Sequence, residues 1–278
     1  MDKKFILVYE DEIFEIKTES KRIFIESHKN LFFLDEITSV WYRRGGIRFK
    51  RYQYESISVN IHMNETQHWL EDYVLKILES KKHINKQSNS HVNKLIVLDK
   101  AKKIGLDIPD YYLAENTNEV IIDQTIVKPI AGNPILESIE KNCDGIMYTT
   151  VIEKKEEKNF FITFFQEKIE KDFEIRSFYL NEKIWSMAIF SQNDEQTKTD
   201  FRKYNIDKPN RNVRYTLPKE IEQKIIKLMQ NLDLNCGSLD FMKSGNTYYF
   251  LEVNPVGQFG NISADCNYLL EKEIAEYL

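Results

Sequence analysis

Three oxygen-bearing side chains lie near the end of the chain, in two short apolar runs. Asp240 is in the first run, Glu252 and Asn254 are in the second, and a polar segment at residues 243–246 separates the runs. This arrangement predicts a β-hairpin, and because side chains alternate along a strand, Glu252 and Asn254 point to the same face. Asp240 joins them if the strands pair in a suitable register. Such oxygens suit Mg²⁺, which takes its other ligands from water and nucleotide phosphates. The alternative is a hairpin with solvated polar positions, and these residues alone leave both interpretations open.

The composition limits the classes of protein to consider. The 278 residues are 42% hydrophobic, with 9 Gly and 6 Pro, which is typical of a globular protein with one compound domain or two to three lobes. The net charge is −5 and basic residues are dispersed, so we expect no nucleic-acid partner. No apolar run approaches the roughly 20 residues of a membrane helix, and no signal-type segment follows the first residues. We therefore expect no membrane partner and a cytoplasmic location.

The cysteines support the same compartment. Cys143, Cys236 and Cys266 are isolated from one another and lack the spacing of a metal site. Three such thiols fit a reducing environment and argue against a disulfide framework. We interpret them as residues in or near the core.

The elements that must position the oxygen-bearing residues can be read along the chain. Apolar and aromatic runs predict strands, and apolar side chains at helical spacing predict amphipathic helices. A polar run at 81–90 marks a lobe boundary. The predicted strands are 5–9, 22–26, 31–34, 37–42, two short strands within 119–128, 149–152 paired with 160–166, and a hairpin of 177–180 with 184–190. The predicted helices are 65–80, 93–104, 218–232 and 267–278.

Two basic features in these elements could contact an anion. Lys128 closes a buried strand, so its ammonium group either reaches solvent or meets an anion. Arg43 and Arg44 end the strand at 37–42 and could grip a carboxylate or phosphate, or lie in solvent. The charged turn at 154–158 is either a solvated hairpin tip or a lid over phosphates, and we favour the lid.

The order of these pieces resembles the ATP-grasp fold. Over residues 93–255, a lysine opens a helix that ends in Gly-Leu-x-Ile-Pro. After it come, in order, a Val-Lys-Pro strand end, a Gln-Glu-x-Ile linker with acids and an Arg, and the hairpin with Asp and Glu-x-Asn. Within that superfamily the chain is most similar to the graspetide synthetases, which make microviridin-like peptides, and in particular to the peptide maturase of grasp-with-spasm systems. The segments that carry this similarity are 40–44, 172–176, 200–202, 251–259 and 267–275. Gly45 stands where many relatives have Pro.

The resemblance implies an α/β (α+β) fold with three parts. They are an N-terminal pre-ATP-grasp domain (1–88), a central subdomain (89–166) and a C-terminal subdomain with the Mg²⁺ site (167–278), with ATP in the cleft between the last two. The implied site residues, each of which could instead form an ordinary surface ion pair, fall into groups by role. They are Lys94 and Lys128 on the ATP phosphates; Gln166, Glu167, Lys168 and Ile169 around adenine; Asp172 or Glu174 on ribose; Arg176, Arg202 and Lys128 in catalysis; and Asp240, Glu252 and Asn254 on Mg²⁺.

The resemblance also implies a reaction and a substrate. It is that of an ATP- and Mg²⁺-dependent macrocyclase, which phosphorylates Asp or Glu side chains of a ribosomally made precursor peptide (leader plus core). A Ser or Thr hydroxyl or a Lys amine then displaces phosphate, giving an ω-ester or ω-amide. The alternatives are an amino-acid ligase, a small-molecule kinase and an ATP-regulated binding module. Oligomeric state stays open, with a homodimer among the options.

Overall fold

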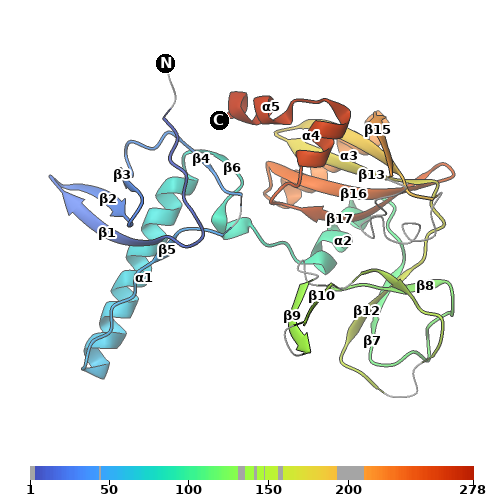
Figure 1. Cartoon of the computed structure of the whole chain (residues 1–278), viewed down its shortest axis with the longest axis horizontal. Helices are drawn as coiled ribbons and strands as arrows, with labels where there is room; N and C mark the ends of the chain where they lie inside the picture. Colours follow the sequence, from blue (N-terminus) through green and yellow to red (C-terminus); the bar gives the residue numbers. More distant parts are fainter. Residues whose placement is uncertain are drawn as a thin grey trace. The chain divides into compact units, whose positions relative to one another are not determined.

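The computed structural model divides the chain into two compact units, which are described separately (Figure 1). The first unit contains Met1–His91 and Lys272–Leu278, and the second contains Val92–Glu271. The structure describes residues 4–43, 45–130, 135–140, 143–146, 148–155, 159–192 and 210–278. Among these residues, no helix combines the length and the hydropathy that crossing a membrane requires.

The first unit is a small sheet packed on one long helix. β1 pairs antiparallel with β2 and parallel with β5, and the sheet order is β3-β2-β1-β5. Phe14, Ile25 and Phe32 from the sheet pack with Val74 and Leu78 of the helix to form the core. The elements are β1 (Ile13–Glu19), β2 (Arg22–Glu26), β3 (Leu31–Phe33), β4 (Ser39–Trp41), β5 (Arg48–Phe49), α1 (Ile57–Glu79), β6 (Lys82–Ile84) and η1 (Gln87–Asn89), with β4 parallel to β6.

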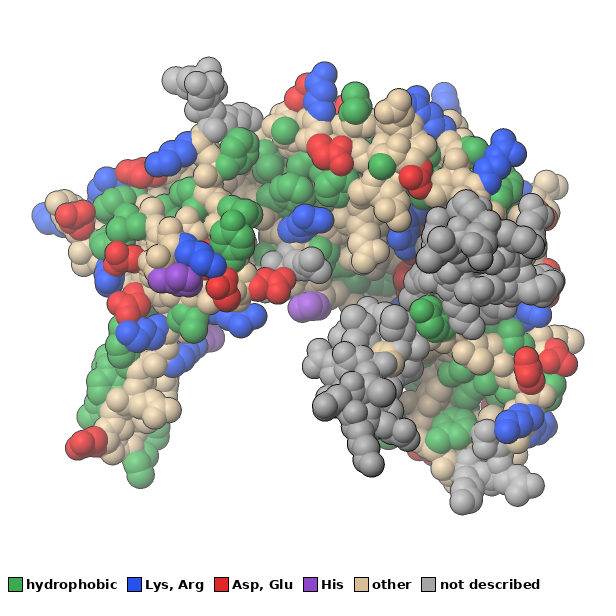
Figure 2. All heavy atoms as spheres, viewed as in Figure 1, with side chains coloured by type: hydrophobic (Ala, Val, Ile, Leu, Met, Phe, Trp, Pro, Cys, Tyr) green, Lys and Arg blue, Asp and Glu red, His purple; other side chains and the backbone are tan. Residues whose placement is uncertain are grey.

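Two predictions for this unit were wrong in detail. Residues 5–9 form no strand, and Phe5 is 72% exposed. The segment ends in a turn, in which the Glu12 amide donates to the Tyr9 carbonyl, and it adds to neither edge of the sheet. The helix begins at Ile57 and not at residue 65, because Ser56 caps it by accepting a hydrogen bond from the Val59 amide. The apolar side chains of its first turns are exposed (Figure 2). They do not follow the apolar spacing of an amphipathic helix, so the sequence pattern did not reveal these turns.

The second unit begins with a helix and a four-stranded sheet. Asn93 caps α2 (Lys94–Lys103), accepting hydrogen bonds from the Leu95 and Ile96 amides. Gly105 has φ +85°, a conformation that favours glycine and ends the helix as predicted. The sheet has the order β11-β8-β12-β7, and a separate hairpin lies between β8 and β11 in the chain. The strands are β7 (Tyr111–Ala114), β8 (Thr125–Val127), β9 (Ile135–Glu140), β10 (Cys143–Ile146), β11 (Thr150–Val151) and β12 (Thr163–Glu167).

This sheet corrects two expectations. Residues 119–124 form turns, so only the second of the two strands predicted within 119–128 exists. The strands predicted at 149–152 and 160–166 do not pair with each other, because β8 lies between β11 and β12. Val127 of β8 faces Thr150 on one side and Phe165 on the other. The Val-Lys-Pro strand end is therefore held in the interior of the sheet.

A five-stranded antiparallel sheet forms the larger part of the second unit. Its order is β15-β14-β13-β16-β17. Ile175, Leu239 and Phe241 on one face pack with Ile225 and Leu228 of α3 in the main core, and Phe178 on the other face contacts Phe259 beside α4. The elements are β13 (Phe173–Leu180), β14 (Lys183–Phe190), β15 (Arg211–Tyr215), α3 (Lys219–Asn231), β16 (Cys236–Ser244), β17 (Thr247–Asn254) and α4 (Gly260–Cys266). The last helix, α5 (Leu270–Tyr277), begins in this unit, and its residues from Lys272 onward belong to the first.

The helix predicted at 267–278 is shorter than expected. Asn267 has φ +55° and ends α4, so the last helix begins only at Leu270. The helix α4 itself was not predicted. Cys236 and Cys266 are buried free thiols, as expected, and the side chain of Cys143 lies outside the described residues.

Candidate active site

The predicted hairpin is β16 and β17, and its register gathers the oxygen-bearing side chains. Asp240 faces Glu252, and Ser238 faces Asn254. A bulge between Asp240 and Phe241 produces this match, because Phe241 faces Phe250 and a regular ladder would have set Asp240 against Leu251. Without the extra residue, Glu252 would point to the opposite face from Asp240.

A third strand extends this row. Arg176 of β13 faces Asp240 on its other side, so Arg176, Asp240 and Glu252 stand side by side across three strands. Directly opposed residues of an antiparallel pair have Cβ atoms about 4.5–5.5 Å apart. We call these three residues the charged row. It lies on the face opposite the α2/α3 core.

Arg176 and Asp240 form a two-point ion pair. The guanidinium Nε and Nη2 atoms lie 2.7 and 2.8 Å from the two carboxylate oxygens, and the side chains are 16% and 19% exposed. The charge of Asp240 raises the pKa of Arg176 further above its ordinary value, against the opposing effect of burial. Arg176 therefore stays charged at any working pH and is held in a fixed orientation.

Gln258 also contacts this arginine, although it was not among the predicted site residues. Its Oε1 lies 3.5 Å from Nη1 of Arg176, and its carbonyl accepts a hydrogen bond from Ser238 Oγ. The signal that could have found it is its place in the segment 251–259, which carries part of the family resemblance and leaves the hairpin after Asn254.

Lys94 connects the charged row to the first sheet of the unit. It is the first residue of α2, and its Nζ lies 2.9 Å from Glu252 Oε2 and donates to the Pro129 carbonyl at 3.2 Å. The end of β8, with Lys128, is thus close to β17. Lys128 Nζ lies 5.9 Å from the centre of the Phe164 ring.

Gln166 occupies an unusual position in β12. Its side chain is fully buried, and neither its amide nitrogen nor its oxygen has a hydrogen-bond partner among the residues that the structure describes. Leaving such a group unpaired costs about 1–3 kcal/mol, so it is expected to have a ligand. A buried carboxamide can pair with the donor and acceptor edge of a nucleobase, so this residue fits the expected adenine site.

Other predicted residues make local contacts. The Asp172 carboxylate accepts a hydrogen bond from the Gly245 amide in the β16–β17 turn, and Glu174 forms a buried ion pair with Lys171. Their predicted contact with ribose would require these interactions to change. The remaining positions are as follows: the Glu167 amide bonds to the Asp110 carbonyl, Lys168 pairs with Glu170 at 3.2 Å, Ile169 is half-buried, and Asn254 Oδ1 accepts from the Val256 amide.

Some predicted features lie outside the described residues. They are Arg44, Arg202 and residues 156–158 of the expected lid. All assigned roles stay predictions.

The donor set of the hairpin fits Mg²⁺. Two facing carboxylates and a carboxamide oxygen are hard ligands, and Mg²⁺ usually needs only one or two carboxylates because it keeps water and phosphate oxygens. Within the described part of the chain, no group of three or more His, Cys, Asp or Glu residues could hold a metal, so a site made wholly of such side chains is not formed there. Asp240 and Glu252 are neutralised instead by Arg176 and Lys94.

Comparison with known proteins agrees with this geometry. The model of the RimK-like ATP-grasp domain matches residues 125–278, more than half of the chain. The chain belongs to the RimK-like ATP-grasp family. The expected ATP-grasp fold is thereby confirmed, and the matched region holds Lys128, Gln166 and the whole charged row.

Solved structures with the same fold match nearly the whole length of this chain. A Chryseobacterium gregarium RiPP-associated ATP-grasp ligase is 24% identical, covers 96% of this chain and 83% of its own, and superposes with a TM-score of 0.71. The macrocyclase MdnC from Microcystis aeruginosa MRC is 23% identical, with 96% and 86% coverage and a TM-score of 0.68. The ATP-grasp ligase PsnB is 15% identical, with 96% and 85% coverage and a TM-score of 0.62. No curated protein sequence matches the chain.

Proposed function

We propose that this ATP-grasp protein is a peptide macrocyclase of the graspetide type. It would use ATP to activate Asp or Glu side chains of a ribosomally made precursor and join them to Ser or Thr hydroxyls, or to a Lys amine, of the same peptide. The observation that carries the proposal is the charged row, with Lys94 on Glu252 and Lys128 at the adjacent strand end. Solved structures of the same fold support the choice of substrate. The C. gregarium ligase was solved with ADP and a leader and core peptide, and MdnC with the precursor peptide MdnA.

The chemistry requires positive charge beside a phosphate chain. A carboxylate is a poor acyl donor, so ATP is needed to convert it to an acyl phosphate with release of ADP. A hydroxyl or amine of the peptide then attacks the acyl carbon, its proton passes to solvent and phosphate departs, so the peptide loses one water per link. Catalysis of phosphoryl transfer is mostly positioning and neutralisation of phosphate oxygens. Arg176, Lys94 and Lys128 can supply that charge.

The cations of the site must change partners during this process. Mg²⁺, when bound by Asp240, Glu252 and Asn254, would neutralise phosphate oxygens and hold them in place. Arg176 and Lys94 now pair with the two carboxylates. With the two carboxylates held on Mg²⁺, the side chains of Arg176 and Lys94 would be available to bind phosphate oxygens. The site thus keeps its charges paired before and after binding, which limits the desolvation cost.

The expected partner is a precursor peptide with a leader and a core. A leader bound away from the chemistry would raise the effective concentration of the core at the site. We also propose a cytoplasmic location, supported by the buried free thiols of Cys236 and Cys266. A homodimer stays a prediction that light scattering can test.

The decisive experiment uses the purified protein, ATP, Mg²⁺ and the peptide encoded by a short reading frame beside the gene, with a C-terminus rich in Thr or Ser and Asp or Glu. We expect ADP, phosphate and a peptide lighter by one water per link. Hydroxylamine would open ω-esters and leave ω-amides intact. Glu252→Gln should abolish the mass loss, whereas Glu220→Gln, which removes an exposed α3 carboxylate paired with Lys224, should not.

Other products would contradict the proposal. A peptide that gains a phosphate would indicate a kinase, and a peptide that gains an amino acid would indicate an amino-acid ligase. Unchanged mass loss in the Glu252→Gln variant would show that the hairpin is not the reaction site.

A further inference from the structure

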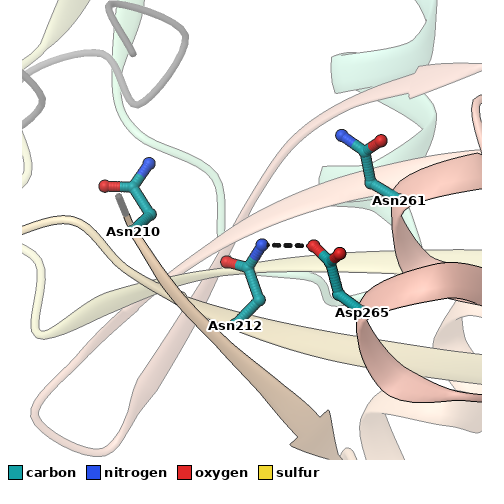
Figure 3. A pocket seen from close by; sticks show the side chains of 4 residues that line it. All are labelled: Asn210, Asn212, Asn261 and Asp265. Carbon is teal, nitrogen blue, oxygen red and sulfur yellow. Dashed lines mark hydrogen bonds between the residues drawn. The ribbon is translucent and has the colours of Figure 1, made fainter. Parts of the chain in front are cut away.

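A polar hollow of about 540 Å³ lies beside β15, one edge strand of the large sheet. Of the described residues, four line it: Asn210 just before β15, Asn212 in β15, and Asn261 and Asp265 on α4 (Figure 3). Their side chains converge from the strand and the helix across the hollow. Three carboxamides and one carboxylate make a lining that can form hydrogen bonds but offers little apolar contact.

The hollow has more acceptor capacity than the described residues use. Asn212 Nδ2 donates to Asp265 Oδ2 at 2.6 Å, while Asn212 Oδ1 is buried and has no hydrogen-bond partner in the described part of the chain. In Figure 3 this oxygen points away from Asp265, on the side of Asn210. A buried acceptor without a donor is unfavourable, so the site favours a ligand that brings N–H or O–H groups. The carboxylate of Asp265 adds a preference for positive charge.

The register places this hollow on the reaction face of the sheet. Asn212 faces Ile189, which faces Glu174, and Glu174 is two residues from Arg176 on the same side of β13. Two strand spacings of about 4.8 Å and two residues of rise put the Cα atoms of Asn212 and Arg176 roughly 12 Å apart. An extended peptide covers that distance with about three to four residues.

A cation of the protein lies close by but is already engaged. Arg214 is two residues from Asn212 on the same face of β15, and its guanidinium donates to the carbonyls of Cys266 and Asn267 and lies over the Tyr268 ring. It therefore closes the end of α4 and leaves the Asp265 carboxylate for another donor.

We propose that the hollow is a specificity subsite that binds a lysine side chain of the peptide substrate, three to four residues from the side chain being activated. The ammonium group would donate to Asp265, a backbone N–H of the same peptide would donate to Asn212 Oδ1, and the Asn261 carboxamide would line the path of the side chain. This assignment rests on the proposed function for its choice of a peptide. The binding it predicts can be measured without any reaction.

The test uses the full-length protein with selective ¹⁵N labelling of asparagine, so that side-chain amides can be followed by NMR. The probe is Nα-acetyl-lysine N-methylamide, with the norleucine and threonine analogues as comparison ligands. For a probe of about 14 non-hydrogen atoms, a dissociation constant on the order of 1 mM is expected. We expect saturable shifts of the Asn212 and Asn261 amides with the lysine probe alone. Asp265→Asn should weaken binding at least about tenfold, because a charge-assisted hydrogen bond is lost.

The control is Glu182→Gln, which removes a carboxylate from the β13–β14 turn at the far end of the same sheet. It should bind the lysine probe as the unmodified protein does. Equal shifts with lysine and norleucine, no saturable shift, or a preference for threonine would overturn the proposal. Those results would not touch the macrocyclase proposal, which ADP release and peptide mass test. Conversely, lysine binding without any peptide ligation would support the subsite and contradict the macrocyclase.

Discussion

Replacing Asp240 with asparagine should destabilise the second unit as well as stop the chemistry. The substitution keeps the shape of the side chain but leaves the Arg176 guanidinium without its counter-charge. An arginine side chain is charged at all working pH values even without a partner, so Arg176 keeps its charge in the variant. The result is a largely buried cation with incomplete pairing.

The structure sets the size of this effect. Removing one partner of a buried pair costs about 3–5 kcal/mol. Arg176 is 16% exposed, and Gln258 and Glu252 remain near it, so we expect the lower end, about 3 kcal/mol. For a unit of this size that corresponds to a fall in Tm of roughly 6–12 °C. Replacing both partners, as Arg176→Met with Asp240→Leu, should recover most of the stability without restoring activity.

Urea unfolding measures the effect if the second unit has its own reporter. Trp185 lies in β14 of the second unit, whereas Trp41 and Trp69 lie in the first unit. The substitutions Trp41→Phe and Trp69→Phe therefore leave the fluorescence of Trp185 as the probe of the second unit. Glu220→Gln is the matched control, because it removes one carboxylate of an ion pair in the same unit, but on the exposed surface of α3, where Glu220 pairs with Lys224. Unchanged unfolding of the Asp240→Asn protein, or a double variant as unstable as the single one, would refute the reasoning.

Three further predictions concern the core, a buried acid and the nucleotide site. Leu228→Ala, in the fully buried stripe of α3, should lower the unfolding free energy by about 2–5 kcal/mol in urea; no change would contradict the assigned core. Glu12 is buried, and hydrogen bonds from Ser27, the Tyr9 amide and Asn30 outweigh burial and lower its pKa. The ionised Glu12 should therefore stabilise the first unit fully above about pH 4.3, and this stabilisation should be lost as the pH falls through the lowered pKa. In Glu12→Gln the unfolding free energy should depend less on pH in this acidic range, and an unchanged dependence would refute the assignment. Lys94→Met should weaken ATP binding about 10–100-fold in calorimetry, since a cation on the phosphates is removed; unaltered affinity would exclude that role.

Local sequence patterns determined much of the framework. Asn93 before an apolar helical run and Gly105 after it marked α2 at both ends, since caps and left-handed residues act over a few positions. The alternation of side chains along a strand is also local, and it placed Glu252 and Asn254 on one face of β17. Where an element depended on a distant partner, prediction failed. The segment at 5–9 has strand-like residues but joins no sheet, and β8 lies between two strands that were expected to pair.

The sequence by itself determined which side chains were available for the chemistry and in what order: Lys94, Lys128, Gln166, Arg176 and the oxygens of the last hairpin. Only the tertiary structure decided which of them meet. A single bulge after Asp240 turned Glu252 to its side, and β13 brought Arg176 from 64 positions away in the sequence. The physical reason is that side-chain direction in a sheet repeats every two residues, so a shift of one residue reverses the face. That register is set by pairing between distant strands, which no local spacing records.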